Sequence, residues 1–143
     1  MKNIKTSYIL IGLAVLIIGG FGLSKYLQAS DPNVASTSAF HWHPTLMIYV
    51  KGQKQEIPAN IGIGAVHQPM HTHAEDASKG VVHLEFGGAA RNDELKLSRL
   101  FEIWGKDMQS FGSNMAMTVN GKPNTELGDY VFQDGDKIEL RYE

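Results

Sequence analysis

The sequence predicts an α+β protein in which a mixed sheet packs on one amphipathic helix, preceded by one N-terminal transmembrane helix. Three features carry this prediction: an uncharged apolar run from Thr6 to Ser24, alternating apolar and polar residues in 81–86 and 137–142, and apolar residues three and four positions apart in 97–108. Alternation is typical of a strand with one buried face, and the three-and-four spacing is typical of a helix with one buried stripe.

The apolar run is long enough to span a membrane. A spanning helix needs about 20 largely apolar residues, which Tyr8 to Leu27 supply if the long side chain of Lys25 reaches the lipid headgroups. Lys2 and Lys5 precede the run, and this positive charge places the N-terminus in the cytoplasm. We therefore expect a single-pass protein of the cell membrane. A cleaved signal peptide is the alternative, although the apolar stretch of such a peptide is only about 7–15 residues long.

Three parts follow along the chain. Residues 1–29 are the transmembrane signal-anchor, the polar residues 30–39 with Pro32 are a linker, and residues 40–143 are one extracytoplasmic domain. The chain beyond the apolar run carries ten basic and fifteen acidic residues, a net charge of −5, which argues against nucleic acid and favours cationic ligands. The absence of cysteine excludes disulfides, thiolate metal sites and blue-copper centres.

Turn signals and periodicity predict the elements of the domain. Residues 45–50 and 55–57 form a hairpin around the turn at 51–54, and Asn120-Gly121 is the strongest hairpin signal in the chain. Residues 59–70 are irregular or bulged strand, and 71–80 form a loop. The helix ends at Gly112. Its stripe consists of Leu97, Leu100, Phe101, Trp104 and Met108. In the last strand Ile138, Leu140 and Tyr142 face inward.

The C-terminal strands carry a first resemblance. Thr118 to Gly121, followed by Asp134 to Leu140, resembles the last strands of β-grasp domains, the ubiquitin-like group. The resemblance implies a β-grasp-like sheet around the helix, and it implies no particular activity because that fold serves many functions.

The histidines are the candidate functional residues. All six lie between residues 41 and 83, and two of the groups are His-x-His pairs: His41-Trp42-His43, His67, His71-Thr72-His73 and His83. Alternate residues of an extended chain project to the same side about 6.5–7 Å apart, so each pair can share or flank one ion. Imidazole is the commonest neutral metal ligand, so we expect a metal site at His41, His43, His71, His73 and His83.

Several alternatives stay open at this point. His67, Met47, Met70 and Glu85 are not assigned as ligands, and a solitary His83 on a strand is also typical of a hydrogen-bonded surface histidine. Copper(II) leads the affinity order for nitrogen-rich sites without thiolates, and zinc is the competitor because four imidazoles suit its tetrahedral preference. A pH-sensing histidine cluster has the same sequence pattern.

A second resemblance covers most of the domain. Five blocks are similar to a group of small membrane-anchored, His-rich extracytoplasmic proteins and domains of archaea and bacteria: 41–44, 56–63, 71–73, 80–85 and 101–105. The resemblance implies the location and the ligand positions. Some members belong to archaea with copper-based energy metabolism, which favours copper, and the group carries no established activity.

Function follows from the metal site. We expect a metal-binding protein for copper delivery, not an enzyme, with no catalytic residues and no organic cofactor. One alternative is an accessory subunit of a membrane copper enzyme, whose helix would pack through small residues such as Gly12 and Gly19. Another is a zinc- or copper-dependent enzyme with Glu85 or Glu75 as base. The expected partners are the metal ion, the membrane, and a membrane protein complex or a second copy of the chain.

Overall fold

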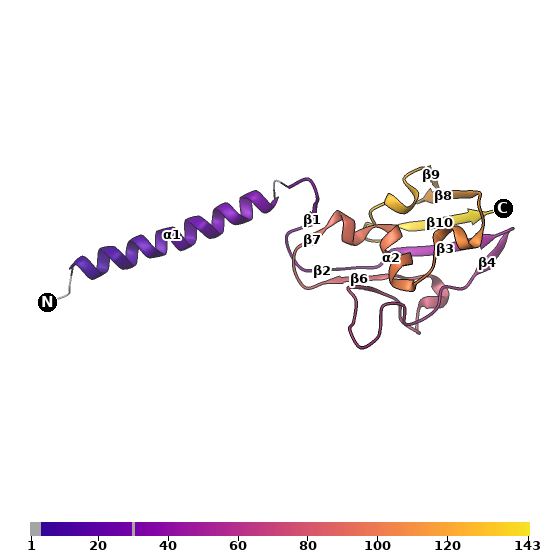
Figure 1. Cartoon of the computed structure of the whole chain (residues 1–143), viewed down its shortest axis with the longest axis horizontal. Coiled ribbons are helices and arrows are strands. Elements are labelled where there is room, and N and C mark those ends of the chain that lie inside the picture. The colour runs from indigo at the N-terminus through magenta and orange to yellow at the C-terminus, as the bar shows by residue number, and fades with distance from the viewer. Residues whose placement is uncertain (1–3, 30) are drawn as a thin grey trace.

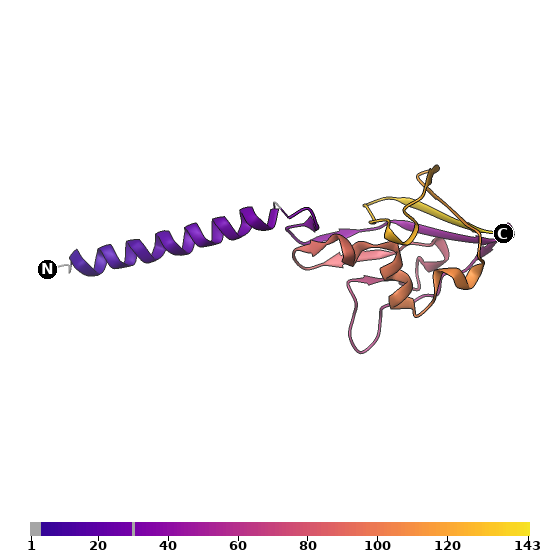
Figure 2. The ribbon, with the colours of Figure 1, turned by 45° about the horizontal axis from the view of Figure 1, so that its top comes forward.

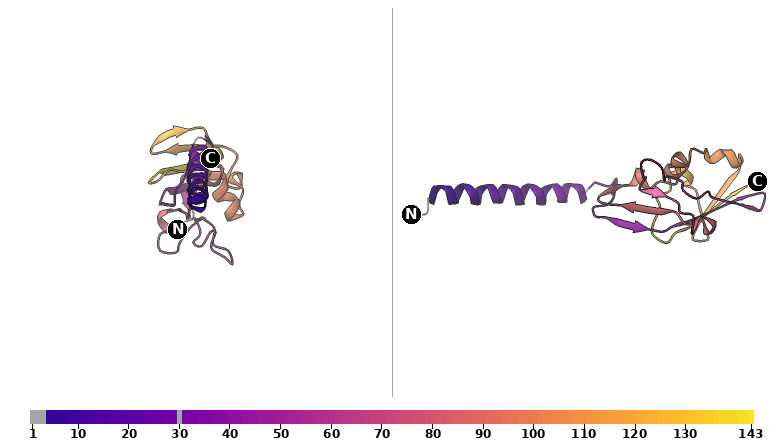
Figure 3. Two further views of the ribbon diagram at one scale, coloured as in Figure 1. Left: turned by 90° about the vertical axis from the view of Figure 1, so that its left-hand side faces the viewer. Right: turned by 90° about the horizontal axis from the view of Figure 1, so that it is seen from below.

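The N-terminal helix stands apart from the rest of the protein. The computed structural model describes residues 4–29 and 31–143, and its helix α1, Ile4–Ala29, projects away from the β-rich part (Figure 1 and the right view of Figure 3). Ser7–Leu27 has a mean hydropathy of 2.1 and none of it is buried, so α1 is long and apolar enough to cross a membrane. A signal sequence near the N-terminus has the same properties.

A five-stranded mixed sheet forms the larger part of the domain. Its strand order is β4-β3-β10-β8-β9, and β10 is parallel to β3 and antiparallel to β8. The strands are β3 (Thr45–Val50), β4 (Gln53–Gln55), β8 (Met115–Val119), β9 (Lys122–Asn124) and β10 (Lys137–Tyr142). Two-residue turns at Lys51-Gly52 and Asn120-Gly121 connect the hairpins, and all four residues have positive φ. This conformation matches the twist of the flanking strands. The hairpin predicted at Asn120-Gly121 agrees with the structure; the first hairpin also forms, but its turn is shorter than the predicted 51–54, and its return strand is Gln53–Gln55 instead of 55–57.

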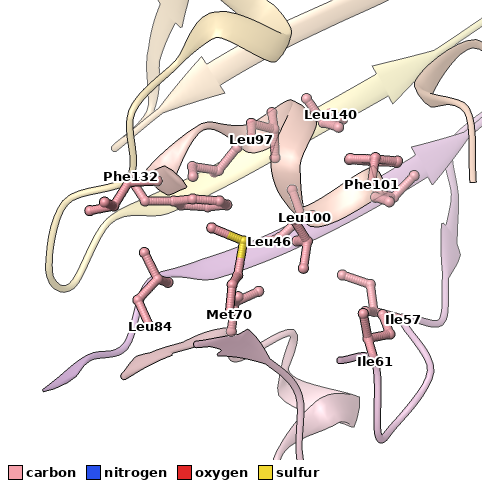
Figure 4. Close-up of a cluster of buried hydrophobic side chains, with 14 of the residues drawn as sticks. Leu46, Ile57, Ile61, Met70, Leu84, Leu97, Leu100, Phe101, Phe132 and Leu140 are labelled. Carbon is pink, nitrogen blue, oxygen red and sulfur yellow. The ribbon is translucent and has the colours of Figure 1, made fainter. Parts of the chain in front are cut away.

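One helix covers a face of this sheet. Helix α2 (Leu97–Trp104) buries Leu97, Leu100 and Phe101 against Leu46 and Leu140 of the strands below it (Figure 4). The prediction that the helix ends at Gly112 is wrong. Gly105, with φ of 71°, terminates it by donating its N–H to the carbonyls of Phe101 and Glu102. Met108, the last residue of the predicted stripe, therefore lies outside α2 and begins a short 3-10 helix, η3 (Met108–Phe111).

A second, three-stranded sheet was not predicted as a separate unit. It has the order β2-β6-β5, all antiparallel, with β2 (Phe40–Trp42), β6 (His83–Phe86) and β5 (Met70–His71). The prediction of a single mixed sheet is therefore too simple, and the predicted loop 71–80 begins with a strand residue. Between β4 and β5 the chain forms turns, which extend as a long loop below the sheet in Figure 2.

The predicted linker is part of the folded domain. Strand β1 (Val34–Ser36) lies within it and pairs antiparallel with β7 (Ala90–Arg91). The carboxylate of Asp31 lies 3.6 Å from Arg91, and the carbonyls of Pro32 and Asn33 accept hydrogen bonds from the side-chain and backbone nitrogens of Asn92. Among residues 31–143 the chain also forms the 3-10 helices η1 (Ala77–Lys79), η2 (Asn92–Leu95) and η4 (Leu127–Asp129).

Candidate metal centre

Each strand of the three-stranded sheet contributes one histidine to the same face. His41 of β2 lies opposite Glu85 of β6, and His71 of β5 lies opposite His83 of β6. Residues that lie opposite each other in an antiparallel pair project to the same side, and so do alternate residues of one strand. His41, His71 and His83 therefore share one face of the sheet.

The other face of the same sheet is apolar. Phe40, Leu84, Phe86 and Met70 occupy the alternating positions and belong to the hydrophobic core or pack against it. Met70 points into that core in Figure 4. The alternation of the strands separates the histidines from the core, and Met70 is a core residue.

Thr72 holds the second histidine pair in place. It is fully buried, its hydroxyl donates to the carbonyl of Pro58 at 2.8 Å, and the backbone N–H of Ile61 donates to that hydroxyl at 3.1 Å. Its backbone N–H also donates to the carbonyl of Ile61 at 3.1 Å. Because Thr72 points inward, its neighbours His71 and His73 project together to the other side.

The first pair is fixed by backbone hydrogen bonds of His43 and Pro44. The backbone N–H of His43 donates to the carboxylate of Asp134 at 2.9 Å, and the carbonyl of the buried Pro44 accepts from Val82 at 2.9 Å. These bonds join the end of β2 to the turn before β10 and to the start of β6. His41 and His43 themselves remain exposed to solvent.

Two three-histidine groups result, and they share His83. One ring nitrogen from each of His41, His43 and His83 lies within 4.8 Å of the others, and the same holds for His71, His73 and His83. The closest pairs are His41 Nε2 to His83 Nδ1 at 3.2 Å and His71 Nε2 to His73 Nε2 at 3.1 Å. All five predicted ligands are thus brought together, although in two groups instead of one.

These two contacts are hydrogen bonds between imidazoles, and their lengths also fall within the range found between ligands of one ion. For metal–nitrogen bonds of about 2.0 Å, neighbouring ligand atoms are about 3.3 Å apart in a tetrahedron and about 2.8 Å apart in a square plane. The observed 3.1 and 3.2 Å lie between these values. Each pair could therefore accept an ion with small movements of its rings.

Sequence reasoning missed Asp76. The Oδ2 atom of Asp76 lies 2.9 Å from His83 Nε2, so His83 carries a proton on that nitrogen and donates it to the carboxylate. A carboxylate in this position orients a metal-binding imidazole and increases its basicity. No local pattern separated Asp76 from the neighbouring Glu75, which is exposed, because only the fold brings residue 76 beside residue 83.

His71 is held by a second hydrogen bond of the same kind. Its Nδ1–H donates to the carbonyl of Gln68 at 3.0 Å, which leaves the Nε2 lone pair directed at His73. Burial lowers the pKa of His71 below its usual value, and the neighbouring imidazoles of His67 and His73 lower it further. The neutral form, which is the form that binds a metal ion, is therefore favoured at this position.

His67 lies beside the cluster but outside both groups. Its ring centroid is 4.3 Å from that of His71 and 6.4 Å from that of His73. With His41, His71 and Glu85 it lines an open pocket whose volume is about 640 Å³. The sequence left the role of His67 open, and the geometry assigns it to the rim of this pocket.

The comparisons with known proteins add no relative. No protein-family model, curated protein or solved structure matches this chain.

Proposed function

We propose that this protein is anchored in the cell membrane by α1 and binds copper on the extracytoplasmic side through its histidine cluster, in order to deliver it to an acceptor. The observation that carries the proposal is the convergence of His41, His43, His71, His73 and His83, whose ring nitrogens form two groups, each within 4.8 Å. Neutral imidazoles without thiolates form a donor set that suits divalent copper or zinc.

Delivery, as opposed to permanent storage, is supported by the exposure of the first pair. His41 and His43 face solvent, whereas His71 is only 1 % exposed. An acceptor can approach the exposed imidazoles and replace them one at a time. Copper is proposed before zinc because copper(II) has the higher affinity for nitrogen ligands.

Metal content and competition test this proposal. The full chain, purified in detergent, is titrated with copper(II) and with zinc(II) against a chelator of known affinity. We expect one copper ion per chain and weaker binding of zinc. If neither metal binds, or if a variant that replaces His71, His73 and His83 together binds as the wild type does, the cluster is not a metal site. If zinc binds more tightly, the site stands and the choice of copper is wrong.

The location is part of the proposal. Lys2 and Lys5 precede the apolar segment, which supports a cytoplasmic N-terminus and an extracytoplasmic domain. Protease added to intact cells with a permeabilised outer layer should digest residues beyond Ser30. Protection in intact cells, with digestion only after lysis, would reverse this topology.

We also propose a β-grasp assignment for the larger sheet. Its support is the central position of the C-terminal strand β10, parallel to β3, in a mixed sheet that packs on the single helix α2. A solved structure in which β10 lies at the sheet edge would contradict it.

Catalysis is the second candidate, and the pocket beside the cluster is the observation that favours it. Glu85, the base considered from sequence, is exposed and lines that pocket with His41 and His71. Glu85→Gln separates the two functions. It should leave copper affinity unchanged if the protein only binds metal, and should abolish hydrolytic activity of the metal-loaded protein if Glu85 acts as a base.

A further inference from the structure

Resting on the proposed metal binding, we infer that the cluster holds one ion at a time in two alternative positions, which share His83 as a common ligand. The outer position consists of His41, His43 and His83, and the inner position consists of His71, His73 and His83. An ion enters at the outer position and is retained at the inner one, moving between them by exchange of the other two imidazoles around His83.

The ring contacts place the two pairs around His83 without joining them. The His83 centroid is 5.5 Å from His41 and 4.9 Å from His43. On the other pair, it is 5.5 Å from His71 and 4.6 Å from His73. Within the described ranges 4–29 and 31–143, no ring contact links His41 or His43 directly with His71 or His73. Binding one ion to all five imidazoles at once would therefore require the two histidine pairs to move toward each other. Binding it at either three-histidine group does not require this movement.

Asp76 limits the pair of positions to one ion. A neutral imidazole has one N–H and one lone pair, and the Nε2–H of His83 is used for the 2.9 Å hydrogen bond to Asp76. While that hydrogen bond is kept, the ring nitrogen of His83 that can bind a metal ion is Nδ1, which lies 3.2 Å from Nε2 of His41. Two ions could share His83 only if its second proton were removed and the Asp76 hydrogen bond were broken.

The two positions differ in rigidity and access. In the inner position His71 is 1 % exposed and donates to the carbonyl of Gln68, and Thr72 fixes the backbone between His71 and His73. In the outer position the imidazoles of His41 and His43 are exposed. Ligands that are already oriented bind more tightly, so the inner position should have the higher affinity, and the open outer position should exchange faster.

Copper(II) added to the full chain in detergent tests this inference without any variant. We expect one ion per chain at saturation and, as copper is added, an electron paramagnetic resonance spectrum of isolated copper. Two ions per chain with magnetically coupled spectra would show that His83 bridges them, and would overturn the exclusion of a second ion.

Two double variants then separate the positions. His41→Ala with His43→Ala removes the outer position, and should keep equilibrium affinity close to that of the wild type but slow copper uptake and its transfer to a chelator. His71→Gln with His73→Gln removes the inner position. This variant should bind one ion with a different spectrum, a faster release, and an affinity reduced by more than the roughly 10–100-fold that loss of an outer hydrogen-bond partner costs.

Further variants provide controls. Asp76→Asn should weaken both positions by roughly 10–100-fold because it removes the carboxylate behind the shared ligand. His67→Gln, which replaces a histidine outside both groups, should have the smallest effect. Circular dichroism confirms that each variant is folded before its affinity is compared.

The result separates this inference from the proposed function. If wild-type protein binds no copper, the proposed function fails. If it binds copper but both double variants lose affinity equally and show one spectrum, the metal site stands and the two positions are wrong.

Discussion

Copper at a hundredfold excess over its Kd should stabilise the folded chain by about 2.7 kcal/mol, because a ligand that binds only the folded state adds RT ln(1 + [L]/Kd) to the free energy of unfolding. The ligands come from β2, β5 and β6 and the residues that follow β2 and β5, so the unfolded chain does not hold them together. For a domain of about 100 residues, 1 kcal/mol corresponds to about 4–8 °C in Tm. We therefore expect Tm to rise by about 10–20 °C.

Differential scanning calorimetry of the full chain in detergent, with copper or with a chelator, measures this shift. The same copper concentration is applied to His71→Gln with His73→Gln, and each protein is compared with its own metal-free form. If the Kd of this variant is a hundredfold higher, the stabilisation falls to about 0.4 kcal/mol. His67→Gln is the matched control and should keep most of the shift.

Acidification provides a second check on the same shift. Each ligand must be unprotonated, so the stabilisation by copper should diminish as the solution is acidified from neutral pH. The reasoning is refuted if copper leaves the Tm of the wild type unchanged, or if the double variant gains as much stability as the wild type.

Three further predictions concern the fold. Phe101→Ala should lower the free energy of unfolding by about 3–5 kcal/mol because this ring is 2 % exposed. Trp104→Ala should lower it less because that ring, at the end of α2, is half-buried. Equal losses for the two variants in urea denaturation would contradict this. Thr72→Val should lower the free energy of unfolding by about 1–3 kcal/mol and weaken copper binding, because the Thr72 hydroxyl makes two hydrogen bonds to the backbone. Denaturation measures the first effect and metal competition the second. Unchanged copper affinity would show that Thr72 does not orient the histidines. Tyr142→Phe should raise the free energy of unfolding by about 1 kcal/mol, because the buried hydroxyl has no hydrogen-bond partner among the described residues. Burial also raises the pKa of Tyr142 to about 12. The free energy of unfolding of the wild type should therefore stay constant below about pH 10 and fall as the pH rises toward 12. Denaturation across that range should show a smaller loss of stability for Tyr142→Phe.

Local signals in the sequence predicted local structure well. The turn at Asn120-Gly121 requires positive φ at both residues, which Asn and Gly favour, and the hairpin forms there. The alternation in 137–142 placed Ile138, Leu140 and Tyr142 in the core, as the structure confirms. Such features depend on neighbours along the chain, and the sequence lists those neighbours directly.

Features that depend on distant residues were predicted less well. The spacing of the histidines indicated a cluster, but its division into two groups depends on the register of β2 and β5 on β6, which no local pattern specifies. Asp76 escaped prediction for the same reason. The helix end was misplaced because Trp104 and Met108 continue the apolar spacing, whereas the left-handed conformation of Gly105 has already turned the chain away.

The attachment of the segment before β2 determines how freely the domain can move. Helix α1 ends at Ala29, while Asp31 already contacts Arg91 of β7. Two residues of extended chain span about 7 Å at most, so the Cα atom of Asp31 stays within that distance of the Cα atom of Ala29, and the side chains of Asp31 and Arg91 connect this point to β7. If α1 lies in the bilayer, the connection between helix and domain is too short to act as a flexible tether. The domain then diffuses laterally with its helix and stays close to the lipid surface. Its encounters with an acceptor then become a two-dimensional search, and the acceptor best placed to meet it is one that is also embedded in the membrane.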